Sequence, residues 1–238
     1  LASGKGISLT VRCQLQPRSS GGEMEGHLEV WNARSGVPVR VPTYCSISGS
    51  ESGRTLKVSA DGIVAGAFAT VQGALGVARA GDVIEIADDE AYFETIVIGM
   101  GQDGRPLDGL VLRGTSTPKA ALDGSQAAAS LPVVTVSGAH NVRIENLAIR
   151  GGGQGVRFQD ASGSVSRCSI STRSAGGGAH GIHVEPGSSV ILEGNLIRDL
   201  GGMGVNVDGG DTLLVGNTLG DSQSYRPVGY HPVRIQNN

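Results

Sequence analysis

The chain is poor in aromatic residues and in lysine. Its 238 residues contain three Phe, four Tyr, one Trp and three Lys, against 39 Gly. A chain with so few large rings and so many glycines must turn often and pack mainly with Val, Ile, Leu and Ala, which favours stacked short strands over a helical bundle. The net charge of −3 offers no basic surface of the kind that nucleic acids and anionic membranes attract. We therefore expect no nucleic-acid partner.

Long apolar runs are also missing from the sequence. No run reaches the roughly 18 to 20 residues that a membrane-spanning helix needs. We therefore expect no membrane span. The stretch after Leu1 has no signal-peptide pattern, as we also expect of a processed chain.

Cysteine is scarce, and its spacing excludes the common metal motifs. Cys13, Cys45 and Cys168 form no CxxC pair and no zinc-like spacing. Cys13 and Cys45 could form a disulfide in an exported chain, or they could be two buried thiols. The sequence leaves both alternatives open.

Residues 1–60 read as a small antiparallel β segment. The stretch "ISLTVRCQL" from Ile7 to Leu15 alternates apolar and polar residues, which predicts a strand with one buried face. The stretch "HLEVWNARSGVPVRV" predicts two strands around an "ARSG" turn. A change of composition near Asp61 and Gly62 then indicates a second unit over residues 61–238.

The second unit opens with a short helical pattern. Phe68, Val71, Leu75 and Ala78 share one face at helical spacing, and Gly81 is a typical helix terminator. The following "VIEIADDEAYFETIVI" predicts two strands. We expect the helix to cover the start of a longer β structure.

From Val133 onward the chain repeats itself. Two apolar columns recur at intervals of 21 to 28 residues. The first is Val136, Phe158, Val184, Val207 and Ile235, and the second is Ile149, Ile170, Ile197 and Leu219. Units that bury apolar columns against their neighbours, with no helical pattern between them, predict an all-β fold, a right-handed parallel β-helix solenoid with neighbouring strands about 4.8 Å apart.

Alternation within the repeat strands predicts which side chains face outward. If the first column points into the solenoid, two polar columns point out of the same sheet. One is Thr135, Arg157, His183, Asn206 and Arg234, and the other is Ser137, Gln159, Glu185, Asp208 and Gln236. Glu185 and Asp208 would then lie on adjacent rungs with carboxyl groups about 5 Å apart, near the separation in retaining glycosidases.

The stretch "FATVQGALGVARAGDVIEIADDEAYFETIVI" resembles the opening of pectate-lyase-like β-helix proteins, in which a capping helix leads through a "GD" turn into the first coil. The repeats are similar to those of the same superfamily, including Asn195 and Asn217 at the "GN" turn, where such proteins often stack asparagines. Leu147 and Cys168 occupy that position in earlier coils, so we expect an incomplete ladder. The resemblance covers roughly residues 65–238.

This resemblance implies an acidic polysaccharide as partner, held along the outward sheet, and an extracellular or cell-envelope location. The implied catalytic residues are His183, Glu185 and Asp208, because His titrates near neutral pH and paired carboxylates serve acid–base chemistry. Glu185 and Asp208 could alternatively hold Ca²⁺, the cation that neutralises a uronate in many such lyases. The implied substrate-binding residues are Arg157, Asn206, Arg234, Tyr230 and His231.

A second interpretation needs no catalysis. A parallel sheet facing solvent must be polar, and unlike charges on neighbouring rungs are ordinary pairing devices. No lysine falls on the predicted sheet, although lysine often supplies the base in lyases of this superfamily. The alternative is therefore a β-helix scaffold, adhesin or interaction domain of a larger protein. The final "PVRIQNN" starts a further coil, so we expect a fragment of a longer β-helix or an open C-terminal coil that another molecule contacts.

Overall fold

The computed structural model describes residues 53–60, 64–117, 119–128, 130–172, 180–198, 200 and 202–220 in full, and five outlying strands by their backbone. The chain divides into two units, Leu1–Ser50 and Glu51–Asn238. The sequence placed this boundary after residue 60. The second unit begins earlier because residues 55–58 already pair in parallel with residues 83–86.

The first unit is a three-stranded antiparallel sheet. It contains β1 (Gln16–Pro17), β2 (Glu23–Trp31) and β3 (Pro38–Ser46), in the order β1-β2-β3. The hairpin of β2 and β3 confirms the two strands predicted on either side of the "ARSG" stretch. The strand predicted from Ile7 to Leu15 lies outside the described residues, as do the side chains of Cys13 and Cys45.

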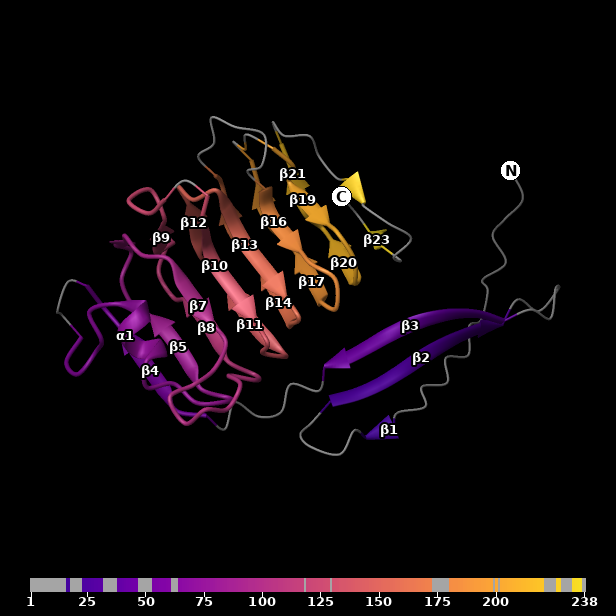
Figure 1. Cartoon of the computed structure of the whole chain (residues 1–238), viewed down its shortest axis with the longest axis horizontal. Helices are drawn as coiled ribbons and strands as arrows, with labels where there is room; N and C mark the ends of the chain where they lie inside the picture. The colour runs from indigo at the N-terminus through magenta and orange to yellow at the C-terminus, as the bar shows by residue number, and fades with distance from the viewer. Residues whose placement is uncertain are drawn as a thin grey trace, which may run out of the picture. The chain divides into compact units, whose positions relative to one another are not determined.

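The second unit is a right-handed β-helix of three parallel sheets, whose coils follow one another from violet to yellow in Figure 1. The sheet that carries the predicted site, named here the β7–β22 sheet, contains β7 (Ile96–Ile98), β10 (Pro132–Ser137), β13 (Gln154–Gln159), β16 (His180–Val184), β19 (Val205–Val207) and β22 (Arg226–Pro227).

The other two sheets complete each coil. The β4–β23 sheet contains β4 (Thr55–Val58), β5 (Val83–Ile86), β8 (Val111–Gly114), β11 (Val142–Glu145), β14 (Ser162–Ser166), β17 (Ser189–Glu193), β20 (Asp211–Val215) and β23 (Val233–Gln236). The β6–β21 sheet contains β6 (Ala91–Tyr92), β9 (Ala121–Asp123), β12 (Ala148–Arg150), β15 (Ser169–Ile170), β18 (Leu196–Ile197) and β21 (Thr218–Leu219).

Helix α1 (Val71–Leu75) packs on the first strands of the solenoid. Thr70 caps it by accepting a hydrogen bond from the backbone N–H of Gly73. Both carboxylate oxygens of Glu94 also accept backbone N–H bonds from its first turn. The helix ends at a cap on Gly76, so it is shorter than the pattern to Gly81 predicted. No helix in the described part of the chain is long and apolar enough to cross a bilayer.

The core is a stack of aliphatic columns, and both predicted columns are confirmed up to the fourth coil. Val136, Phe158, Val184 and Val207 follow one another in register, as do Ile149, Ile170, Ile197 and Leu219. Every member of the first set is at most 1% exposed. Each coil therefore buries its inward side chains against the coils on either side of it, as a solenoid requires.

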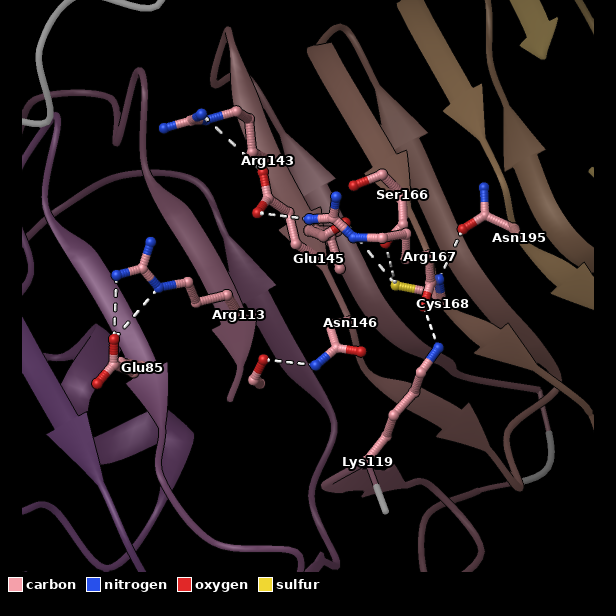
Figure 2. A network of polar contacts seen from close by, with 12 residues as sticks. Glu85, Arg113, Lys119, Arg143, Glu145, Asn146, Ser166, Arg167, Cys168 and Asn195 are labelled. Carbon is pink, nitrogen blue, oxygen red and sulfur yellow. Dashed lines mark hydrogen bonds and ion pairs between the residues drawn. The ribbon is translucent and has the colours of Figure 1, made fainter. Parts of the chain in front are cut away.

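A partial asparagine ladder lines one corner. The side-chain amides of Asn195 and Asn217 donate to the carbonyl oxygens of Val165 and Leu192, each at 2.8 Å, and Asn195 donates to Asn217 Oδ1 at 2.9 Å. Asn195 Oδ1 accepts the backbone N–H of Cys168 in the preceding coil, a contact drawn in Figure 2. The ladder stops at Cys168, as the sequence predicts. These bonds satisfy backbone groups that would otherwise be buried without a partner.

The outward face of the β4–β23 sheet pairs opposite charges along the solenoid. Lys57, Glu85, Arg113 and Glu145 lie on successive rungs in register. Arg113 lies 3.0 Å from Glu85 and Arg167 lies 3.5 Å from Glu145. Both contacts are drawn in Figure 2. Partly exposed pairs of this kind contribute about 0.2–1 kcal/mol each, so we attribute to them a role in rung register.

Candidate functional site

Five of the predicted site residues, Arg157, His183, Glu185, Asn206 and Asp208, lie on the outward face of the β7–β22 sheet. Strands β10, β13, β16 and β19 bring four polar residues into one row, because each strand pairs with the next in register. The row is Thr135, Arg157, His183 and Asn206. A second row follows two positions later, where the backbone N–H groups of Glu185 and Asp208 bond to the preceding coil at 3.0 and 2.9 Å. These two rows therefore include Arg157 and the two carboxylates of Glu185 and Asp208.

Glu185 is held by Arg157, one rung before it. Arg157 Nε donates to Glu185 Oε1 at 2.8 Å, and a second guanidinium nitrogen contacts the same oxygen. The contact runs diagonally, from the first row of one coil to the second row of the next. Arg157 is therefore neutralised by a neighbour and is not a free cation.

Asp208 is held by two donors. His183 Nε2 lies 2.6 Å from Asp208 Oδ2, and Asn206 Nδ2 donates to Asp208 Oδ1 at 3.1 Å. His183 is diagonal to Asp208 in the same way as Arg157 is to Glu185. The His183 side chain is 12% exposed and Asp208 is 37% exposed. The carboxylate therefore faces solvent while its partners are largely covered.

His180 lies beside His183 because of a local irregularity in β16. Gly181 and Ile182 are both buried, so two inward residues separate two outward ones. The rings of His180 and His183 are 5.5 Å apart at an interplanar angle of 68°. Burial lowers the pKa of His180 and the His183 ring lowers it further, whereas the Asp208 carboxylate acts in the opposite direction. The environment of His180 therefore favours the neutral form of its imidazole.

A column of glycines allows adjacent coils to stack at this irregularity. Gly155, Gly181 and Gly204 begin successive "GV", "GI" and "GV" pairs, and their backbones approach closely. A Cβ at Gly155 would lie 2.4 Å from the carbonyl oxygen of Gly181, and one at Gly181 would lie 2.5 Å from that of Gly204. Such contacts are sterically forbidden, so only glycine allows the coils to stack here.

Four buried polar atoms around the two histidines have no hydrogen-bond partner. They are Gln154 Oε1, His180 Nδ1, His183 Nδ1 and Asn206 Oδ1. Gln154 is in register with His180, and Asn206 is in register with His183. A buried polar atom without a partner costs about 1–3 kcal/mol, so the four together are unusual in a native sheet.

Arg234 does not lie where the sequence placed it. Its backbone is opposite Leu213 in the β4–β23 sheet, and Gln236 is opposite Val215. Arg226 of β22 is the residue in register with Asn206. The prediction was wrong because "YRPVGYH" contains a further strand that lacks the apolar alternation of the earlier coils. The predicted substrate-binding residues Tyr230 and His231 lie outside the described residues.

A cation at Glu185 and Asp208 stays a prediction. Each carboxylate is engaged by its own base, whereas Ca²⁺ takes six to eight oxygen ligands. Within the described ranges no three His, Cys, Asp or Glu side chains come together as ligands. The two carboxylates alone do not fit Ca²⁺ in this arrangement.

Sequence reasoning did not include Gln154 or His180 among the catalytic and substrate-binding residues. The signal was present in the glycine that precedes each apolar pair. A glycine followed by an aliphatic residue at the same point of three coils indicates two consecutive inward residues. The residue before the glycine and the residue after the aliphatic one then both point outward from the same face.

Comparisons with known proteins concern the fold alone. A family model described as "Right handed beta helix region" matches residues 110–230. Neither the curated proteins nor the solved structures contain a match. The matched segment covers β8 through β22, and its parallel strands form the three sheets described above. The chain therefore belongs to the right-handed β-helix family.

Proposed function

We propose that the outward face of the β7–β22 sheet binds an acidic polysaccharide. The observation that carries the proposal is the in-register row from Thr135 to Asn206, which repeats a polar side chain at every coil. A row with a constant step of about 4.8 Å suits a linear polymer laid along the solenoid axis.

Arg157 is the proposed contact for a sugar carboxylate. Its side chain is 34% exposed, and the planar donors of its guanidinium match a carboxylate in a bidentate arrangement. Binding would require a uronate to replace Glu185 as the partner of Arg157. Asn206 would contribute at the other end of the row, with Tyr230 and His231 proposed as rim contacts.

Cleavage or modification of the glycan is the finer part of the proposal. His183 and Asp208 supply an imidazole whose orientation a carboxylate fixes, the arrangement that prepares a histidine for proton transfer. Glu185 would be available for chemistry only after Arg157 is drawn to the substrate. His183, Glu185 and Asp208 accordingly remain the proposed catalytic residues.

The second candidate function is a non-catalytic scaffold or interaction domain. The observation in its favour is that both carboxylates are paired locally with a base on the adjacent row. Such pairs stabilise rung register without any ligand, as on the β4–β23 sheet.

Calorimetric titration with polygalacturonate and with a neutral glycan would distinguish the two candidates. We expect saturable binding of the polyuronate that Arg157→Gln weakens at least tenfold. Arg150→Gln is the matched control, because Arg150 forms an ion pair with Asp123 on the β6–β21 sheet. A folded protein that binds none of the glycans would favour the scaffold. The appearance of unsaturated sugar ends, followed by ultraviolet absorbance, would establish a lyase.

A further inference from the structure

Beside the two carboxylates lies a second cluster, which shares His183 and Asn206 with the proposed glycan site. It contains His180 and His183 from β16, Gln154 from β13 and Asn206 from β19. Each contributes one of the four unpartnered buried atoms, two imidazole nitrogens and two amide oxygens. We name these four residues the two-histidine cluster.

We propose that the two-histidine cluster binds one divalent transition-metal ion of the Zn²⁺, Ni²⁺ or Co²⁺ class. The ligands would be Nδ1 of His180 and of His183, with the side-chain oxygens of Gln154 and Asn206. Imidazole nitrogen suits these metals, and neutral oxygen ligands can complete their coordination. The proposal does not depend on glycan binding.

The spacing of the two rings suits a shared ion. With Zn–N bonds of about 2.0–2.1 Å and a tetrahedral angle, two imidazoles on one ion have centres roughly 5 Å apart. The centres of His180 and His183 are 5.5 Å apart, and the rings are steeply inclined at 68°. The separation of the two rings therefore matches that of two imidazoles on one ion.

Asp208 supplies the support that metal-binding histidines have in known sites. A ligating histidine almost always gives its other ring N–H to a carboxylate or carbonyl, which fixes the tautomer and the ring orientation. His183 Nε2 lies 2.6 Å from Asp208 Oδ2, which leaves Nδ1 with its lone pair. The Asp208 carboxylate thus prepares His183 Nδ1 as a ligand.

The same carboxylate orients the amide of Asn206. Asn206 Nδ2 donates to Asp208 Oδ1 at 3.1 Å, so Asn206 Oδ1 points away from the Asp208 carboxylate. Asn206 is only 5% exposed, and that oxygen has no partner. One carboxylate therefore positions two of the four proposed ligands, each from a different coil.

The test is titration of the whole, untagged chain with the metal alone, after treatment with a chelator. We expect one equivalent of Zn²⁺ or Co²⁺ to bind by calorimetry, with a change in the Co²⁺ visible spectrum. His180→Ala and His183→Ala should each abolish saturable binding. His140→Ala is the control, because His140 is an exposed histidine outside the cluster.

Asp208→Asn keeps the test decisive if a histidine variant fails to fold. The Asp208 side chain is 37% exposed, and the loss of its charge should weaken metal affinity about 10- to 100-fold with the ligands intact. The proposal is overturned if a correctly folded chain binds none of these metals at millimolar concentration. It is equally overturned if binding is unchanged in both His183→Ala and Asp208→Asn.

Discussion

His183 Nε2 and Asp208 Oδ2 are 2.6 Å apart although 25 residues separate them, because adjacent coils bring them onto neighbouring rungs. Arg157 and Glu185 form the same diagonal pair one coil earlier, 28 residues apart. The solenoid thus repeats a pairing rule, in which a basic residue at one outward position binds the acid that follows two positions later in the next coil. Each of the two carboxylates therefore contacts a base of its own.

The pairing of Arg157 with Glu185 predicts an unusual effect of removing a carboxylate. Glu185→Gln should tighten polyuronate binding several-fold, because the outward rows would lose one negative charge and Arg157 would lose its competing partner. The affinity of polygalacturonate, measured by calorimetry at fixed ionic strength, checks this.

Glu193→Gln is the control for that experiment, because it makes the same charge change at an exposed position on the β4–β23 sheet. It should leave the affinity unchanged. Weaker binding by the Glu185 variant would instead show that Glu185 itself contacts the glycan.

The end of the asparagine ladder predicts a stabilising substitution. Cys168 Sγ lies 3.8 Å from the carbonyl oxygen of Ile144, the position that matches the acceptors of Asn195 and Asn217 in later coils. Cys168→Asn should extend the ladder by one coil and raise the free energy of unfolding by about 1 kcal/mol. Urea denaturation checks this, and a lower midpoint would show that the corner cannot accept the amide.

The glycine column predicts a position that tolerates no side chain. Gly181→Ala would place a methyl group 2.5 Å from the Gly204 carbonyl oxygen and from Ile197. We expect a loss of about 1–3 kcal/mol in the free energy of unfolding, as for other overpacked sites. Gly220→Ala is the control, since its Cβ would meet only Arg198 Cβ at 3.9 Å. Equal stability of the two variants would contradict the proposed packing.

The fold could be predicted from the sequence because the core residues of a solenoid recur along the chain at nearly regular intervals. Val136, Phe158, Val184 and Val207 set both the strand register and the outward rows, so Arg157, His183 and Asn206 were placed correctly. The placement failed at Arg234, because the strand at Arg226 and Pro227 carries no alternating pattern.

The contacts within the site could not be predicted in the same way. Strand geometry alone suggests that Glu185 and Asp208, on adjacent rungs, face each other. Long side chains pair according to their charge and length. Glu185 contacts Arg157 at 2.8 Å and Asp208 contacts His183 at 2.6 Å, in each case across to the neighbouring row. The repeat in the sequence predicts on which rung and face a residue lies. The ion pairs depend on side-chain rotamers, which the repeat does not predict.

Asp82 predicts how stability depends on pH. Burial alone would raise the pKa of Asp82, but hydrogen bonds from the Arg54 side chain and from the backbone N–H groups of Arg79 and Arg54 lower it below 3.8. A carboxyl with a depressed folded-state pKa stabilises the protein fully above its unfolded pKa of about 3.9, and this contribution is lost as the pH falls toward the folded value. Asp82→Asn should therefore lower stability at pH 7 and flatten its decline between about pH 5 and pH 2. Thermal unfolding across that range measures both effects, with Asp103→Asn as an exposed control on a nearby loop. A decline that is equally steep in the Asp82 variant would assign the acid sensitivity to other carboxyls.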